Sequence, residues 1–454
     1  MRPMRVAAKY VALGLALAAA CERDDLAPLI PDPPDLPSPP EPIAPRCGDG
    51  LANDEDVCLR NLAVKLPYAH EFIRYADFDG DGTSELFAIN TLFQRFAAIF
   101  FTGEFESGGP QVVTHDAFPD HEIFRAEVLD FDGDGRTDLV GATQFYYFEG
   151  DIQTGQIRLI AWRNVGDYKF AEAKSTVAEF YPAPAASFAA GDIDGDGRTD
   201  LFAVDFPTSG FVWSYVPVTD TLEYVYDLDL KPLQVVGQPV VAAADYNGDI
   251  HADFVLMDGS GRAWRIVGGP EHQLTILDPQ ASVVLTPDSE TLYAPDLDGD
   301  GITDLVAVHR IMYSRDHTIS LALGQPGGGF TALASFDTGH DLTYFGGGFF
   351  GGLPEHKHLG FHDLDGSGEL ALVYAPYRQP ELIIHPRIAE TLGAAPVTIP
   401  LDFPANSVFV DDFEGDGEDA IYVTISDNVK VKPSKEVPGG VISTHYLVRF
   451  TPDP

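Results

Sequence analysis

The chain has 454 residues, of which 45% are hydrophobic and 22% charged, and its formal net charge is -42 at pH 7. This hydrophobic content supports a large core and excludes a chain that is disordered throughout. Nucleic acid and anionic membrane surfaces are disfavoured as partners, because both are bound through clustered Lys and Arg. The excess of acid points to cations instead.

Residues 1–20 have the pattern of an export signal. A basic start precedes the apolar run from Tyr10 to Ala20, which is too short to span a bilayer, and three alanines precede Cys21. The segment resembles a bacterial lipoprotein signal, which implies that Cys21 carries lipid and becomes the mature N-terminus. Ala18 stands where such signals usually have Leu, so cleavage by ordinary signal peptidase is the alternative. We therefore expect an exported protein, lipid-anchored in the bacterial cell envelope, periplasmic or surface-exposed, that meets the membrane only through its lipid.

Residues 21–46 form a proline-rich tether, and residues 47–58 a short segment bounded by cysteines. Nine prolines between Ala27 and Pro45 favour an extended polyproline II chain over a helix or strand. Cys47 and Cys58 are an even pair in an exported chain, so they predict one disulfide. A metal site at this pair is the weaker alternative, because no nearby His completes a zinc shell.

An acidic motif recurs along residues 60–454. Five near-complete copies carry an acid or an amide at positions 1, 3, 5 and 9, namely Asp77, Asp79, Asp81 and Glu85; Asp130, Asp132, Asp134 and Asp138; Asp192, Asp194, Asp196 and Asp200; Asp245, Asn247, Asp249 and Asp253; and Asp296, Asp298, Asp300 and Asp304. Two shorter copies hold Asp363, Asp365, Ser367 and Glu369, then Asp412, Glu414, Asp416 and Asp419. The first acids lie 53, 62, 53, 51, 67 and 49 residues apart, so the chain is a repeat array of seven units.

The spacing within one copy favours calcium. Oxygen ligands at alternate positions, with glycine at positions 4 and 6, let a tight loop turn its side chains around one point, and Ca²⁺ takes about six to eight such oxygens. We expect about five to seven Ca²⁺ ions, with the two shorter loops the open cases. The alternative is a set of Asp-Gly turns with solvated acids. An EF-hand is excluded, because position 12 of the five full copies is Ala88, Gly141, Ala203, Leu256 and Ala307.

The segments around each loop predict strands. In the second unit they cover residues 124–130, 139–148, 156–165 and 168–180, and the next unit begins at residue 186. Four strands in each of seven units predict an all-β, seven-bladed β-propeller with four-stranded antiparallel blades. The seventh unit lacks a fourth strand, so we expect the strand from Asn61 to Tyr68 to complete the last blade and close the ring.

The acidic loop followed by a hydrophobic strand resembles the FG-GAP or VCBS-type repeat of integrin α-subunit propellers and bacterial surface proteins, and the resemblance covers residues 60–454. It implies seven blades, Ca²⁺ bound in the loop between the first two strands of a blade, and recognition often on the opposite face. The ligands that it implies here are the acids and Asn247 named above.

The sequence shows no catalytic site, and whether the chain is an enzyme stays open. The leading hypothesis is a monomeric, envelope-anchored binding or adhesion module for an unknown protein or glycan, with Tyr146, Tyr147, Tyr313 and Phe350 as candidate contacts. The alternatives are a polysaccharide lyase or hydrolase on a calcium propeller, and a structural spacer in a surface assembly. His356, His358 and His362 are a candidate second metal site, for example for Zn²⁺, against the simpler reading of an exposed loop.

Overall fold

A computed structural model of the 454-residue chain was analysed. It describes residues 46–47, 58–66, 72–80, 82, 84–90, 95–101, 110–116, 123–149, 152–167, 169–172, 187–205, 208–237, 239–310, 316–326, 328–340, 342, 359–364, 366–376, 379–391, 395–411, 420–430 and 441–452. The chain divides into two compact units, residues 42–427 with 444–454 and residues 1–41 with 428–443. The description below concerns the first unit, apart from the ends of two strands that continue into the second.

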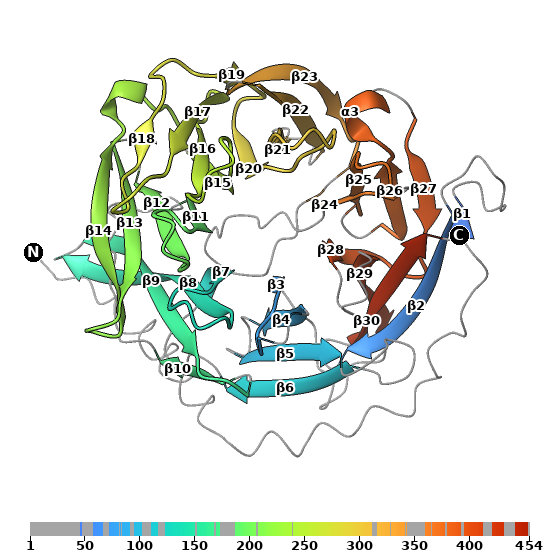
Figure 1. The fold of residues 1–454 in the computed structure, drawn as a ribbon. Coiled ribbons are helices and arrows are strands. Elements are labelled where there is room, and N and C mark those ends of the chain that lie inside the picture. Colours follow the sequence, from blue (N-terminus) through green and yellow to red (C-terminus); the bar gives the residue numbers. More distant parts are fainter. Residues whose placement is uncertain are drawn as a thin grey trace, which may run out of the picture. The chain divides into compact units, whose positions relative to one another are not determined.

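The described strands of this unit form antiparallel sheets arranged around one axis (Figure 1). Six sheets are blades of consecutive strands. The first blade contains β3 (Phe72–Ala76), β4 (Glu85–Asn90), β5 (Arg95–Phe101) and β6 (Pro110–Asp116). The second contains β7 (Ile123–Leu129), β8 (Asp138–Glu149), β9 (Ile152–Asn164) and β10 (Phe170–Glu172). The third contains β11 (Ser187–Gly191), β12 (Asp200–Asp205), β13 (Ser209–Val216) and β14 (Thr221–Asp229).

The next three blades repeat this order. The fourth contains β15 (Val240–Ala244), β16 (Asp253–Met257), β17 (Arg262–Val267) and β18 (Thr275–Ile276), with the short β19 (Val283–Val284) also paired to β17. The fifth contains β20 (Ser289–Tyr293), β21 (Leu305–Arg310), β22 (His317–Gln325) and β23 (Gly329–Asp337). The sixth contains β24 (Leu359–His362), β25 (Ala371–Tyr374), β26 (Glu381–His385) and β27 (Val397–Pro400). Two short helices lie in connections, the 3-10 helix η1 (Lys231–Leu233) and α3 (Ile388–Thr391).

The remaining sheet combines strands from both ends of the chain. Its order is β1 (Arg46–Cys47), β2 (Cys58–Leu66), β30 (Val441–Pro452), β29 (Ala420–Lys430) and β28 (Ala405–Asp411). β2 pairs antiparallel with β30, from Leu59 opposite Pro452 to Leu66 opposite His445. The predicted N-terminal closing strand is therefore confirmed.

The predicted count of seven four-stranded blades is corrected. The described strands form six such blades, because the three strands β28 to β30 do not make a blade of their own and are extended by β1 and β2 into a five-stranded sheet. The register of β1 and β2 places Cys47 opposite Cys58. The predicted fourth strand of the second unit, residues 168–180, is shorter in the structure, since β10 ends at Glu172 and residues 173–186 lie outside the described ranges.

The core lies between neighbouring sheets, which explains why the inner strands are apolar on both faces. On β12, Leu201 and Ala203 pack toward the second blade, whereas Phe202 and Val204 pack toward the fourth. This is the alternation of a strand with period two, and each face meets another sheet. All five residues of β16 are buried for the same reason. Within the described ranges, none of the helices has the length and hydropathy of a membrane span.

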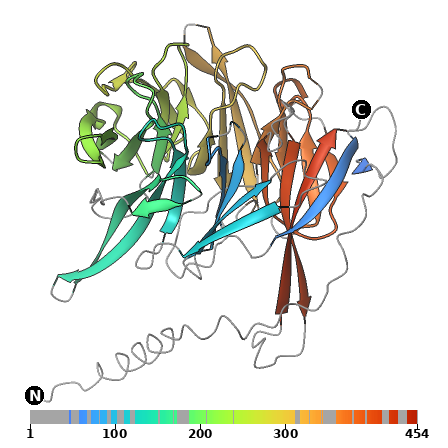
Figure 2. The ribbon, with the colours of Figure 1, turned by 60° about the horizontal axis from the view of Figure 1, so that its bottom comes forward.

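The innermost strands carry the acidic loops to one another. β3 lies beside β7, β7 beside β11, β11 beside β15, and β15 beside β20. Each acidic loop follows such a strand directly, so the loops also succeed one another around the axis. The β8–β9 hairpin is longer than its counterparts and extends beyond them (Figure 2).

Candidate metal centre

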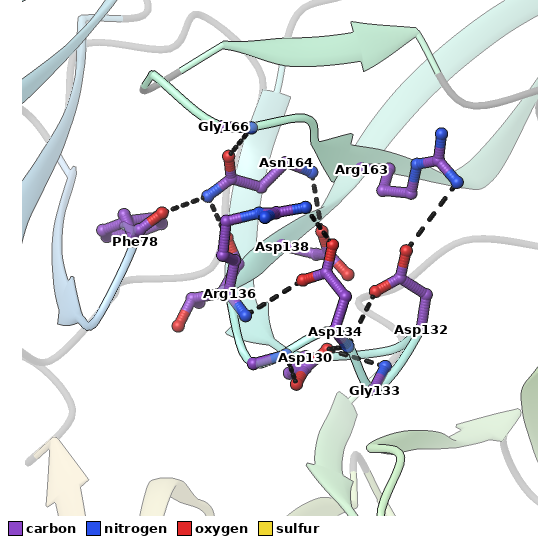
Figure 3. Close-up of polar contacts among 12 residues, drawn as sticks. Phe78, Asp130, Asp132, Gly133, Asp134, Arg136, Asp138, Arg163, Asn164 and Gly166 are labelled. Atoms are coloured by element: carbon purple, nitrogen blue, oxygen red, sulfur yellow. Dashed lines mark hydrogen bonds and ion pairs between the residues drawn. The ribbon is translucent and has the colours of Figure 1, made fainter. Parts of the chain in front are cut away.

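The first acid of each loop holds the turn closed through its own carboxylate. In the second loop, Asp130 Oδ1 accepts hydrogen bonds from the backbone N–H of Gly133 at 2.8 Å and of Asp134 at 3.2 Å, and Oδ2 accepts from Gly135 at 2.9 Å (Figure 3). Gly133 and Gly135 have φ of 74° and 82°, a region that other residues rarely adopt. The same bonds recur at Asp77 and Asp192. The two glycines of the motif are therefore required by the turn itself.

The last acid of each full loop is buried and links the loop to the rest of its blade through hydrogen bonds. Asp138 is fully buried, and its two carboxylate oxygens accept from Phe131 N at 3.1 Å and from Asn164 N, at the end of β9, at 2.6 Å. The bond to the second residue of the loop is repeated in the four other full copies, by Glu85, Asp200, Asp253 and Asp304. The bond to the third strand is repeated by Asp253 and Asp304.

Carboxylates at positions 1, 3, 5 and 9 converge as the spacing predicts in four of the full copies. Three carboxylate oxygens lie within 4.8 Å of one another in each of four groups, namely Asp77, Asp79 and Glu85; Asp130, Asp132 and Asp138; Asp192, Asp194 and Asp196; and Asp296, Asp298 and Asp300. In the fourth copy, where an amide replaces the second acid and Ile250 replaces a glycine, no such group is found among the described residues. There Asp245 accepts from Gly248 N, and Asn247 accepts from Asp249 N.

The two shorter copies are only partly within the described ranges. Asp363 accepts hydrogen bonds from Ser367 N and Gly368 N, so the sixth loop keeps the turn of the full copies. Glu369 lies 4.0 Å from Arg387 Nε. Asp81, Asp365, and the whole seventh set of Asp412, Glu414, Asp416 and Asp419 lie outside the described residues.

Nearby cations compensate part of the charge in the second and third loops. Arg136, at position 7, forms an ion pair with Asp134, and Arg198 does the same with Asp196. Arg163 Nη1, from β9, lies 3.8 Å from Asp132 Oδ2 (Figure 3). Such exposed pairs contribute little individually.

Several acids of the loops have raised pKa values, mainly because they are buried. Burial raises the pKa of Asp138 to about 8, with the charge of Asp132 adding to it and the hydrogen bond from Asn164 N opposing it. Burial likewise raises the pKa of Asp304 to about 6, against the hydrogen bonds from Gly324 N and Leu297 N. The pKa values of Asp132 and Asp298 are raised by burial and by neighbouring acids. A cation in the loop would favour the ionised form of these acids.

One loop also presents an acid oxygen with no donor. In the fifth loop, Asp296 Oδ2 accepts from Gly301 N, but Oδ1 is buried and has no hydrogen-bond partner among the described residues. The equivalent oxygen in the first four loops accepts the N–H of the position-4 glycine. An unpaired, buried carboxylate oxygen on an acid that converges with two others fits a cation better than it fits a turn held by hydrogen bonds alone.

The loops are joined through their backbones. The carbonyl of the first acid in one loop accepts a hydrogen bond from the eighth residue of the next, as in Thr137 N to Asp77 O at 3.0 Å and Thr199 N to Asp130 O at 2.8 Å. Ala252 N to Asp192 O, at 2.6 Å, continues the series, and Thr303 Oγ1 to Asp245 O, at 3.0 Å, replaces the amide with a hydroxyl. Sequence reasoning missed this chain of bonds, because it predicted each loop as a separate unit.

The other candidate residues are placed as follows. Tyr146 and Tyr147 lie in the second half of β8, close to its hairpin turn, opposite Gly155 and Thr154 of β9. His362 is buried at the end of β24. Cys21, Tyr313, Phe350, His356 and His358 lie outside the described residues, so the lipid site, two of the aromatic contacts and the histidine group stay predictions.

A comparison with protein families finds the same repeat. Residues 130–203 match the FG-GAP-like repeat. They contain the second and third acidic loops, so the resemblance drawn from the acidic motif is confirmed there. A search of curated proteins finds no match.

One solved structure supports the fold. The chain is similar to the BP39L lectin from Burkholderia pseudomallei, with a TM-score of 0.51 and 13% sequence identity, over 83% of this chain and 95% of the lectin. It is also similar to BBS1N, solved in complex with ARL6DN, with a TM-score of 0.43 and 11% identity, over 85% of this chain and 95% of that one.

Proposed function

We propose that this protein is a calcium-stabilised β-propeller that serves as an exported binding module for a protein or a glycan. The observation that carries the calcium assignment is the convergence of three carboxylates in each of four loops, with the last acid buried at the base of the loop in the two that include it. Hard oxygen donors at this density suit Ca²⁺ better than Mg²⁺, which keeps most of its waters, or Zn²⁺, which prefers nitrogen and sulfur.

The binding role is supported by the fold and by its resemblance. A β-propeller with FG-GAP-like repeats is compatible with a binding module, and one solved structure of similar fold is a lectin. Calcium in this account fixes the loops, holds the buried acids ionised and so stiffens the scaffold that presents the binding face. The proposal includes export through residues 1–20 and a lipid on Cys21, which rest on the sequence pattern.

The metal claim is tested by counting calcium on the full chain and by measuring thermal unfolding in excess EDTA and in millimolar Ca²⁺. A site with a Kd of about 0.1 mM contributes about 1.4 kcal/mol at millimolar Ca²⁺, so about five sites shift the unfolding temperature by many degrees. Asp298→Asn should remove about one ion per chain. Asp229→Asn is the matched control, because Asp229 lies on β14 beside Lys231 and outside every loop. No bound calcium and no shift would refute the assignment.

The binding role is tested on a glycan array, with the protein in millimolar Ca²⁺ and again in excess EDTA. Since the proposed ions stabilise the scaffold, binding to a defined glycan should require calcium. Binding of equal strength in both buffers would separate recognition from the metal and contradict the link between them.

A further inference from the structure

The third acidic loop receives a histidine from the neighbouring blade. His272 lies in the connection between β17 and β18 of the fourth blade, and its Nδ1 is 3.2 Å from Asp194 Oδ2 and 3.3 Å from Asp200 Oδ2. The side chains of Asp194, Asp200 and His272 are 15%, 2% and 19% exposed. These three side chains each offer one atom, and the three atoms lie within 4.8 Å of one another.

Gly268, four residues before His272, packs closely against the third and fourth loops. A Cβ on Gly268, at the end of β17, would lie 3.1 Å from Ile193 O of the third loop and closer still to Ala252 O of the fourth, so only glycine allows this approach. Gly268 N also donates to Asp253 Oδ1 at 3.0 Å. The start of the connection that carries His272 is thus anchored against two successive loops.

The other two acids of the third loop have partners of their own. Asp192 accepts the backbone N–H groups of Gly195 and Gly197, and Asp196 pairs with Arg198. Asp194 and Asp200 pair with the imidazole of His272 instead, and Asp200 Oδ2 also accepts from Ile193 N at 3.1 Å. Among the described residues, the other converging groups contain carboxylates alone, so this is the group that mixes oxygen with nitrogen.

That donor set selects a different class of metal. Ca²⁺ and Mg²⁺ take oxygen ligands, whereas an imidazole nitrogen with carboxylates suits Zn²⁺ and its neighbours in the first transition row. Ligands at about 2.0 to 2.1 Å from a tetrahedral Zn²⁺ are roughly 3.4 Å from one another. The two distances from His272 Nδ1, 3.2 and 3.3 Å, are close to that spacing.

We propose that Asp194, Asp200 and His272 form a binding site for a divalent transition metal such as Zn²⁺, which takes the place of Ca²⁺ in the third loop because Asp194 belongs to both converging groups. The site joins the third blade to the fourth, since the ligands come from both. The competing explanation is an ion pair between a protonated His272 and the two acids, with no metal. The hydrogen bond with Asp200 raises the pKa of His272, while burial opposes this rise.

The two explanations differ in what a variant does to zinc binding. Zn²⁺ is titrated calorimetrically into the metal-free full chain, and bound zinc is counted after dialysis. His272→Gln should lose one Zn²⁺ per chain relative to the wild type, and Asp194→Asn should lose the same one. His251→Gln is the control. The His251 ring also lies near the third loop, since its Cε1 would be 3.2 Å from a Cβ on Gly195, but His251 belongs to no converging group among the described residues. This variant should bind as many ions as the wild type.

Cobalt gives an independent readout. The Co²⁺-loaded wild type should show a visible absorption spectrum that reflects coordination by an imidazole. This spectrum should change in His272→Gln but not in His251→Gln. If His272→Gln does not fold, as judged by circular dichroism, Asp194→Asn decides alone. Equal zinc stoichiometry and affinity in the wild type and in the folded variants would establish the ion pair and overturn the metal site.

Discussion

The two glycines of the fifth loop test how the loops pack. Gly299 and Gly301 both have positive φ, of 70° and 80°. A Cβ on Gly301 would meet nothing within 4 Å, whereas a Cβ on Gly299 would lie 2.9 Å from the carbonyl carbon of Gly368 and nearer still to its oxygen. Real Cβ atoms do not approach closer than 3.0 Å, and the obstacle here is backbone of the next loop. Gly301→Ala therefore changes the backbone energy alone, and Gly299→Ala adds a collision.

The magnitudes separate the two variants. Alanine in the left-handed region costs about 1–2 kcal/mol, which a less flexible unfolded chain offsets by about 0.4–1 kcal/mol. Overpacking adds about 1–3 kcal/mol at Gly299. Gly299→Ala should therefore be the less stable of the two by about 1–3 kcal/mol, measured from urea unfolding midpoints at fixed millimolar Ca²⁺. Equal midpoints would show that the fifth and sixth loops do not touch in solution, and the stacking of loops around the axis would have to be abandoned.

Three further changes test the contacts between blades, the buried last acid of a loop and a buried histidine. Asn164→Ala should lower the free energy of unfolding by about 2–4 kcal/mol, because the Asn164 amide, fully buried, donates to two backbone carbonyls, one of them Phe78 O of the first blade; a loss below about 0.5 kcal/mol in urea unfolding would contradict this. Asp138→Asn leaves one of two backbone N–H groups facing an amide nitrogen, at a cost of about 1–3 kcal/mol, and its destabilisation in thermal melts should be larger in Ca²⁺ than in EDTA; equal losses would remove Asp138 from the ligand set. Burial lowers the pKa of His385 from 6.5 to about 4, so between these pH values the unfolded chain binds a proton that the folded chain does not. The contribution of His385 to the free energy of unfolding is therefore complete above pH 6.5 and falls by up to about 3 kcal/mol as the pH drops to about 4. His385→Phe should remove that part of the pH dependence from urea unfolding curves, and an unchanged slope would refute the assignment.

The strands and the loops could be predicted from local pattern. The second blade shows this, since β7, β8 and β9 lie where short runs of alternating or β-branched residues were expected, and the positive-φ glycines lie at positions 4 and 6 of the loops. These features depend on the pleat of a strand and on the conformational freedom of glycine, and both are determined by a few adjacent residues. The pairing of β2 with β30 was also predictable, because the seventh unit lacked a fourth strand and the strand from Asn61 to Tyr68 was left without a blade.

The rest depended on neighbours that are distant in sequence. Nothing in the segment from Gly268 to His272 indicates that this histidine reaches the third loop, because no spacing rule connects a β17–β18 connection to an acidic turn in the preceding blade. The role of Asn164 is hidden for the same reason, since its amide joins two blades. The blade count failed at the closure, because the last unit supplies only β28 to β30 and these strands form a five-stranded sheet with β1 and β2.

The first acid of a loop links its own turn to the next blade. Its carboxylate binds the glycine N–H groups of its own turn, while its backbone carbonyl accepts a hydrogen bond from the following loop, as at Asp77 and Thr137. A charge imbalance that distorts one turn therefore displaces an acceptor on which the next loop depends. Since buried backbone donors are costly to leave unpaired, the electrostatic state of one loop affects its neighbour through a fixed peptide group. This is the physical reason why a cation, if it occupies these loops, stabilises the propeller as a connected series and not as isolated turns.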